Sequence, residues 1–138
     1  MVNLNNTNYY LQSCKYKPNK KIRNYAYMAY ELALTSEIKK GKHCAIILDN
    51  NSNILEICIN KVLYEKSIHA EIGVINTYIT KNNKNPINCW IMIIRGNLLG
   101  DINLSKPCLN CYKYIKNYKF NKIVWSTGYM KFEVNYLV

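Results

Sequence analysis

The sequence predicts one α/β domain in which helices sandwich a mixed β-sheet. The chain has 138 residues, and helix-like and strand-like apolar patterns alternate along it with only five glycines and three prolines to interrupt them. A chain of this length forms one domain with a substantial buried core. The predicted order of elements is α-β-β-α-β-α-β-β, which suits a layered domain.

The N-terminal segment, residues 1–20, is predicted to be an irregular basic arm, and residues 21–138 to form the domain. The arm begins rich in asparagine and ends rich in lysine. The first helix is predicted from Ile22 to Lys39, because apolar residues recur there at intervals of three and four. Gly41 supplies a stop signal just beyond this helix.

The middle of the chain predicts a hairpin, a helix and a buried strand. Cys44–Leu48 and Ile54–Ile59 are short apolar runs, and the polar residues between them are typical of a turn. A second helix is predicted from Ile68 to about Thr80 on its apolar spacing. The continuous apolar run Cys89–Ile94 suits a strand in the centre of a sheet.

The C-terminal part predicts a third helix, from Cys108 to Tyr118, and two strands, Ile123–Ser126 and Phe132–Val138. Only Thr127–Met130 separates these strands. So short a connection can join antiparallel neighbours, whereas a parallel pair needs a crossover of about a dozen residues or more. The last two strands are therefore predicted to form an antiparallel hairpin.

The net charge is +11, from 19 Lys and Arg against 8 Asp and Glu. A basic balance favours an anionic partner such as a nucleotide or a nucleic acid. Almost all of these cations are lysine, and asparagine, isoleucine and tyrosine are also abundant, so an A+T-rich coding sequence explains the charge equally well. Composition alone leaves both interpretations open.

No apolar stretch is long enough to cross a bilayer, and the start of the chain lacks the pattern of a signal peptide. We therefore expect no membrane association and an intracellular, cytoplasmic location. Of the six cysteines, Cys44, Cys58 and Cys89 lie in or beside apolar runs, where a free thiol behaves as a small hydrophobic group. A reducing environment fits this usage better than disulfides.

Two short motifs carry the candidate chemistry: His69-Ala70-Glu71 at the start of the second helix, and Pro107–Cys111 at the start of the third. One imidazole and two thiolates, from Cys108 and Cys111, are three good Zn²⁺ ligands and leave a fourth position open, as catalytic zinc requires. Cysteines three residues apart can point the same way from a first helical turn. A helix N-terminus also favours thiolates.

Together the motifs resemble the HxE…PCxxC signature of the cytidine deaminase-like superfamily of zinc-dependent deaminases. The resemblance covers roughly residues 22–138 and implies a three-layer fold with a mixed five-stranded sheet flanked by helices. It implies that His69, Cys108 and Cys111 bind the zinc cofactor. It also implies that Glu71, which is not a ligand, moves protons between water, the base and the leaving ammonia.

Two further positions follow from the same resemblance. Asn60, directly after the second strand, resembles the position whose side-chain amide binds the sugar or base. The backbone amide of Ala70 is expected to contact the base carbonyl. Because the superfamily often forms dimers or tetramers, we also expect a homo-oligomer.

The resemblance points to two different branches of the superfamily. His69 stands where enzymes of free cytidine usually have cysteine, which is more similar to deoxycytidylate, guanine, riboflavin-precursor and nucleic-acid deaminases. The predicted C-terminal hairpin instead resembles the branch that contains free-cytidine deaminases. We expect hydrolytic deamination of cytosine in a nucleoside or nucleotide, which yields the uridine product and ammonia.

Two alternatives stay open. The first is the same reaction on single-stranded RNA or DNA, because Tyr112, Tyr114 and Tyr118 alternate with lysines on the third helix, and aromatic and cationic side chains can bind single strands. We favour the simpler interpretation that these tyrosines pack on the sheet while the lysines face solvent. The second alternative is a catalytically idle zinc-binding module.

Overall fold

A computed structural model describes residues 13–39, 41–96 and 105–137. Its helices are α2 (Lys20–Leu34), α3 (Ala70–Asn82) and α4 (Leu109–Lys116). Its strands are β1 (Cys14–Tyr16), β2 (His43–Asp49), β3 (Ile54–Ile59), β4 (Lys61–Leu63), β5 (Lys66–Ile68), β6 (Ile87–Arg95), β7 (Lys119–Gly128) and β8 (Lys131–Tyr136).

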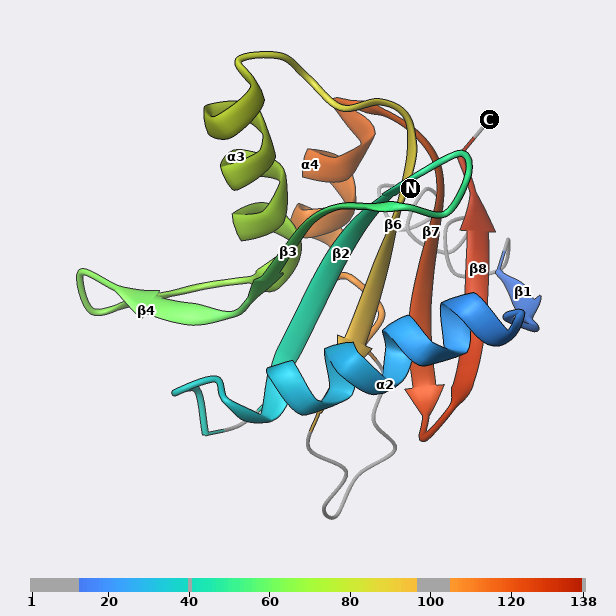
Figure 1. Cartoon of the computed structure of the whole chain (residues 1–138). Coiled ribbons are helices and arrows are strands. Elements are labelled where there is room, and N and C mark those ends of the chain that lie inside the picture. The colour runs from blue at the N-terminus through green and yellow to red at the C-terminus, as the bar shows by residue number, and fades with distance from the viewer. Residues whose placement is uncertain (1–12, 40, 97–104, 138) are drawn as a thin grey trace, which may run out of the picture.

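The central layer is a mixed sheet of six strands in the order β1-β8-β7-β6-β2-β3. β6 and β7 are parallel, and the other neighbours in this sheet are antiparallel. Helix α2 covers one face, whereas α3 and α4 lie together on the other (Figure 1). The predicted three-layer α/β fold is confirmed, as is the C-terminal hairpin, in which Val124 of β7 lies opposite Val134 of β8.

Alternation along the central strands supplies both hydrophobic cores. In β2, the side chains of Cys44, Ile46 and Leu48 pack in the core under α2, and those of Ala45 and Ile47 pack in the core under α3 and α4. Successive strand residues point to opposite faces, so a fully apolar strand can serve two helical layers at once. This explains why the central strands read as unbroken apolar runs.

The sheet has six strands rather than the expected five. The additional strand, β1, lies in the segment expected to be irregular and pairs with the edge strand β8, with Tyr16 opposite Phe132. The Tyr16 ring also packs against that of Trp90, with 6.2 Å between their centroids. Three residues with Lys15 in the middle give no recognisable strand pattern, so the pairing depends on contacts far away in the sequence. The earlier part of the expected arm lies outside the described residues.

Helix α2 ends at Leu34 rather than at the predicted Lys39. Its first turn is capped by the Asn19 side chain, which accepts a hydrogen bond from the backbone N–H of Ile22 at 2.9 Å. Beyond the helix, the buried Ser36 hydroxyl donates to the backbone oxygen of Asn60 at 2.7 Å. Such a side-chain-to-backbone bond competes with continued helix, and here it directs the chain toward the end of β3.

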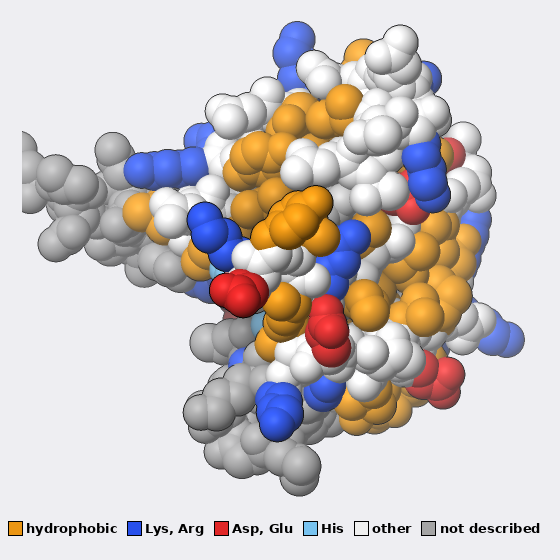
Figure 2. Space-filling view, turned by 90° about the vertical axis from the view of Figure 1, so that its left-hand side faces the viewer, with side chains coloured by type: hydrophobic (Ala, Val, Ile, Leu, Met, Phe, Trp, Pro, Cys, Tyr) orange, Lys and Arg blue, Asp and Glu red, His pale blue; other side chains and the backbone are white. Residues whose placement is uncertain are grey.

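A second small hairpin, β4–β5, was not predicted. Its turn places Tyr64 and Glu65 at φ values of 50° and 65°, where hairpin turns usually have asparagine or glycine. The hairpin projects from the body of the domain (Figure 1), and its exposed residues include Val62 and Leu63. On this side of the molecule, Lys and Arg side chains are scattered among hydrophobic and uncharged ones (Figure 2).

Among the described residues, none of the helices has the length and apolar character needed to span a membrane. All six cysteines are free thiols.

Close packing between Gly96 and α2 provides a test of the fold. A Cβ at position 96 would lie 2.8 Å from the Cβ of Ala33 and 3.1 Å from the backbone nitrogen of Leu34. Gly96→Ala is therefore expected to lower the free energy of unfolding by about 1–3 kcal/mol, as overpacking typically does. Urea unfolding of the variant and the parent protein measures this loss.

Gly73→Ala is the matched control. Position 73 lies inside α3, and the only nearby atom for a new Cβ is Cγ2 of Ile68 at 3.9 Å. Alanine there is expected to stabilise the protein by up to about 1 kcal/mol through its higher helix propensity. An unfolding midpoint for Gly96→Ala equal to that of the parent would contradict the tight contact with α2.

Candidate active site

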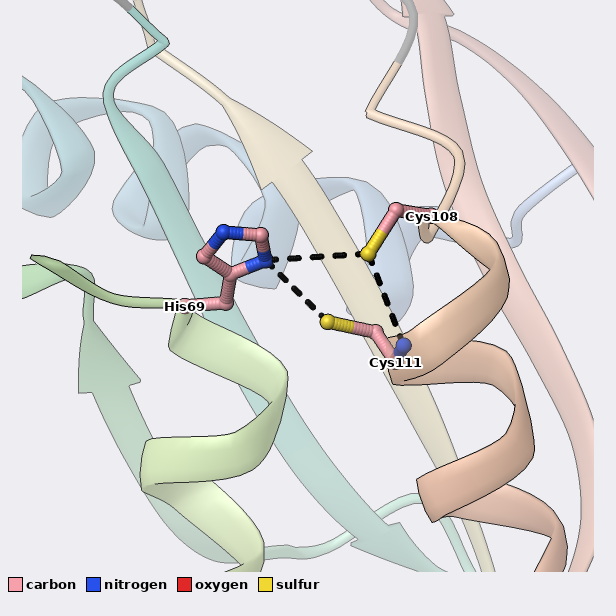
Figure 3. Close-up of side chains that lie close together, drawn as sticks. All are labelled: His69, Cys108 and Cys111. Atoms are coloured by element: carbon pink, nitrogen blue, oxygen red, sulfur yellow. Dashed lines mark hydrogen bonds between the residues drawn. The ribbon is translucent and has the colours of Figure 1, made fainter.

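The two predicted motifs meet because the helices before and after β6 both run back along it. α3 precedes β6 and α4 follows it, so both helices begin at the end of the sheet where β6 finishes. His69 is the N-cap residue of α3, and Cys108 is the N-cap residue of α4. Cys111 lies on the first turn of α4, and the three side chains point toward one another (Figure 3).

The three candidate ligand atoms lie at distances close to those that a metal site requires. His69 Nδ1 lies 3.1 Å from Cys111 Sγ and 3.9 Å from Cys108 Sγ, and all three atoms lie within 4.8 Å of one another. Tetrahedral zinc, with bonds of roughly 2.3 Å to sulfur and 2.0–2.1 Å to nitrogen, separates its ligand atoms by about 3.6–3.8 Å. The cluster therefore fits zinc after small side-chain adjustments.

The two cysteines differ in environment. Cys108 is exposed, and its sulfur accepts a hydrogen bond from the backbone N–H of Cys111 at 3.5 Å, as expected at a helix N-terminus. Cys111 is buried, and its burial, together with the nearby charge of Glu71, raises the pKa of its thiol. A divalent cation would reverse this preference, because zinc binds thiolates and releases their protons.

Glu71 lies on the first turn of α3 and is only 6% exposed. Burial raises the pKa of its carboxyl above the ordinary range, while its own backbone N–H, the charge of His69 and a hydrogen bond with Cys111 act in the opposite direction. A carboxyl whose pKa is raised toward neutrality is suited to exchange protons. Glu71 thus lies beside the ligand cluster without belonging to it.

A cavity of about 270 Å³ opens beside the cluster. It is lined by the predicted residues Asn60, His69, Ala70, Glu71 and Cys108, and also by Ile38, Gly41, His43, Ser67, Ser105 and Lys106. The sixth predicted residue, Cys111, is buried and contacts His69. The structure therefore brings all the predicted site residues together around one cavity.

Asn60 occupies the predicted place, but its amide is also used for structure. Its Nδ2 donates to the backbone oxygen of Gly41 at 2.7 Å, and its Oδ1 accepts from the backbone N–H of His43 at 3.0 Å. One N–H and one lone pair of the amide are left after these two bonds. A contact between Asn60 and substrate therefore stays a prediction, beside an observed role in holding residues 41–43.

The sequence analysis missed six cavity residues, and two of these, His43 and Lys106, can carry charge. His43, one of only two histidines, directly precedes the apolar run of β2, where it looked like an ordinary strand start. Lys106 precedes the second motif, and its ammonium lies 5.6 Å from the centre of the Trp125 ring. A histidine or lysine beside a strand or motif gives no distinctive signal, because only the tertiary fold brings it to the cavity.

Comparison with known proteins agrees with this geometry. Residues 19–127 match the model of the cytidine and deoxycytidylate deaminase zinc-binding region. The chain therefore belongs to this family, within the cytidine deaminase-like superfamily. The family and the His/Cys/Cys cluster confirm Zn²⁺ as the predicted cofactor. No curated protein sequence matches the chain significantly.

Solved structures of two deaminases share the fold. The dCMP deaminase of cyanophage S-TIM5 in apo form is 20% identical, with a TM-score of 0.59 over 80% of this chain and 84% of that one. The same phage protein with dCMP and dUMP gives 17% identity and a TM-score of 0.59, over 79% and 83% of the two chains. A cytidine deaminase from Burkholderia pseudomallei gives 15% identity and a TM-score of 0.58, over 82% and 91%.

Metal analysis tests the ligand assignment. The reduced protein is expected to carry about one zinc per chain. Cys108→Ser is expected to lower zinc content well below this value and to reduce thermal stability, because metal binding is coupled to folding. Inductively coupled plasma mass spectrometry and thermal melts measure both effects.

Cys14→Ser is the control, since Cys14 is an exposed cysteine on β1 at the far edge of the sheet. It should keep both its zinc and its melting temperature. Full zinc occupancy in Cys108→Ser would remove Cys108 from the ligand set.

Proposed function

We propose that this protein is a zinc-dependent hydrolytic deaminase of cytosine in a nucleoside or nucleotide, such as cytidine, deoxycytidine or their monophosphates. The observation that carries the proposal is the buried carboxyl of Glu71, which shares one small cavity with His69 and Cys108. A metal-binding module without catalysis does not need a buried acid beside its ligands. The acid has a free-energy cost that a catalytic role explains.

The reaction exchanges the exocyclic amine of cytosine for the oxygen of water. Zinc held by His69, Cys108 and Cys111 would supply the Lewis acidity that activates a water at neutral pH. Glu71 takes a proton from that water and delivers it to the ring nitrogen next to the amine, while the water oxygen bonds to the ring carbon that carries the amine. It then carries the second proton from that oxygen to the departing amine, so that the carbon–nitrogen bond breaks and ammonia leaves as the carbonyl forms.

Ala70 is proposed to orient the base. As the first residue of α3, it has a backbone N–H that the hydrogen-bond ladder of the helix does not use. This N–H is available to donate to the carbonyl oxygen of cytosine. Since Glu71 follows on the same turn, a base held in this way would keep its ring nitrogen close to the carboxyl.

The dimensions of the cavity support a small substrate. Its volume of about 270 Å³ lies just below the usual range of ligand pockets, roughly 300–1,000 Å³. Lys106 lines the cavity and would place a cation near a substrate phosphate. This favours the monophosphate among the candidate substrates. Self-association and a cytoplasmic location stay predictions.

Replacing the acid separates catalysis from metal binding. Glu71→Gln is expected to keep zinc and the fold but to lower turnover by at least about 10²–10⁴-fold, the usual contribution of general acid–base catalysis. Ammonia release from cytidine, deoxycytidine and their monophosphates measures turnover, while metal analysis and melting temperature are recorded on the same preparation.

Glu56→Gln is the matched control. Glu56 lies on β3, where its carboxylate pairs with Lys81 at 3.3 Å, so its amide variant should retain turnover. Near-normal turnover in Glu71→Gln would refute the proton-transfer role. Loss of zinc from this variant would instead make Glu71 a metal ligand.

The alternative of a polynucleotide substrate receives less support from the third helix. Tyr112, Tyr114 and Tyr118 are partly buried and pack against the core under α3 and α4. The Lys116 ammonium lies 5.4 Å from the centre of the Tyr112 ring. The cation and the ring already interact with each other, which leaves both less available to a phosphate or a base. Tyrosines used for packing present little free surface on which bases could stack.

Oligonucleotide binding tests that alternative. At physiological salt we expect weak, non-specific affinity for single strands, with a Kd of roughly 10⁻⁴–10⁻⁶ M that weakens further as salt rises. Fluorescence anisotropy over a salt series measures this affinity. Tight binding that is lost on joint replacement of Tyr112 and Lys116 by alanine, together with faster turnover of oligonucleotides than of cytidine, would favour the polynucleotide function instead.

A further inference from the structure

His43 lines the cavity, and a backbone contact fixes the tautomer of its imidazole ring. Its Nδ1 lies 2.6 Å from the backbone oxygen of Gly41. A carbonyl oxygen can only accept, so the hydrogen of the ring must be on Nδ1. The neutral ring therefore carries its lone pair on Nε2.

The environment of His43 favours this neutral form. Burial lowers the pKa of the imidazole below its usual value, and the positive charge of Arg95 lowers it further, against the opposing effect of the Gly41 hydrogen bond. The charged ring would have to place a second N–H in the same partly buried space. A neutral acceptor at pH 7 follows from the geometry and the electrostatics together.

The backbone conformation at Gly41 and hydrogen bonds from Asn60 fix the position of the His43 ring. Gly41 has a φ of 69°, in the left-handed region that favours glycine, and a Cβ there would lie 3.3 Å from Cε1 of His43. Asn60 holds the backbone of His43 through two hydrogen bonds. The Asn60 side-chain Oδ1 accepts from the backbone N–H of His43 at 3.0 Å, and the backbone N–H of Asn60 donates to the backbone oxygen of His43 at 3.1 Å. The imidazole is thus pre-organised by Gly41 and Asn60.

The position of His43 selects the part of a substrate that it can meet. Gly41, His43 and Asn60 form a wall of the cavity at β2 and the end of β3, whereas the metal ligands and Glu71 come from the starts of α3 and α4. A base whose amine faces Glu71 would therefore direct its sugar to another part of the cavity. Sugar hydroxyls are donors that match an acceptor nitrogen, while a phosphate offers no hydrogen at neutral pH beyond its weakly held second proton.

We propose that His43 is a specificity-determining residue, whose Nε2 accepts a hydrogen bond from a sugar hydroxyl of the substrate. This inference rests on the proposed deaminase function and assigns the sugar side of the same cavity. It makes the enzyme selective for nucleosides and nucleotides that retain the hydroxyl. A site built around a polar partner discriminates strongly against analogues that lack it, because the buried group is left unpaired.

The test combines variants with substrate analogues. His43→Phe keeps an aromatic ring but removes both nitrogens, and His43→Gln keeps a polar group that can accept. Each variant and the parent protein are assayed with cytidine and with 2′,3′-dideoxycytidine, and with the 5′-monophosphates of both. We expect His43→Phe to lower kcat/KM for cytidine by roughly 10- to 100-fold, the effect of leaving one buried hydrogen-bonding group unpaired.

The same substitution should leave kcat/KM for 2′,3′-dideoxycytidine nearly unchanged, so that the preference for the hydroxylated substrate collapses. His43→Gln should retain part of that preference. Zinc content and melting temperature are measured for each variant, and normal values show that the fold is intact. Equal losses for both substrates, or no loss for either, would overturn the role of His43 while leaving the deaminase function in place.

A failure of the deaminase function gives a different result. If the parent protein releases no ammonia from any of these compounds, calorimetric dissociation constants for cytidine and 2′,3′-dideoxycytidine replace the kinetic readout. Tighter binding of cytidine that disappears in His43→Phe would then support the hydroxyl contact without catalysis. An absence of binding to both nucleosides would overturn the proposed role of His43 together with the substrate class.

Discussion

β6 and β7 run in the same direction in the middle of a sheet whose other neighbours are antiparallel, with Met92 opposite Val124. A parallel pair cannot be joined by a tight turn, so the chain must cross one face of the sheet between the two strands. α4 makes this crossing and begins where β6 ends, beside the start of α3. The ligand cluster, the buried acid and the cavity all lie at this end. The parallel pair is thus the constraint on which the placement of the site depends.

Much of the site could be predicted from the sequence because its reactive residues lie close together in the chain, within two short motifs. His69 and Glu71 belong to one helical turn, as do Cys108 and Cys111, so spacing alone fixes how each pair is presented. The C-terminal hairpin was equally local, because four connecting residues exclude a parallel pairing. What could not be predicted depends on distant partners. β1 is a strand only because β8 offers it an edge, and α2 ends early where Ser36 bonds to Asn60.

Asn60 shows that a residue's place in the site can be predicted from the sequence when its hydrogen-bonding partners cannot. Its position after the second strand marked it as a cavity residue, yet nothing local indicated that its amide would hold Gly41 and His43. The network joins residues far apart in the chain, and it gives one side chain both a structural and a prospective binding function. Substitution of Asn60 therefore cannot report on substrate contact alone, because the loop that carries the imidazole would lose its support. The roles of Asn60 and His43 are therefore separated by changing the substrate, with and without its sugar hydroxyls, rather than by substituting Asn60.

The placement of the ligands at two helix starts also sets the charge balance of the site. Two thiolates would cancel the charge of a Zn²⁺ bound there, and a neutral His69 would add none, so the carboxylate of Glu71 would be the one charge left over in the cluster. Each helix N-terminus contributes roughly half a positive charge, and together α3 and α4 offset that carboxylate. Apart from the cation of Lys106, which lines the same cavity, an uncharged base would therefore meet surroundings that are close to electrically neutral. The chain as a whole carries a formal charge of +11, but charges that lie on the surface far from the site are largely screened from the reacting atoms by salt.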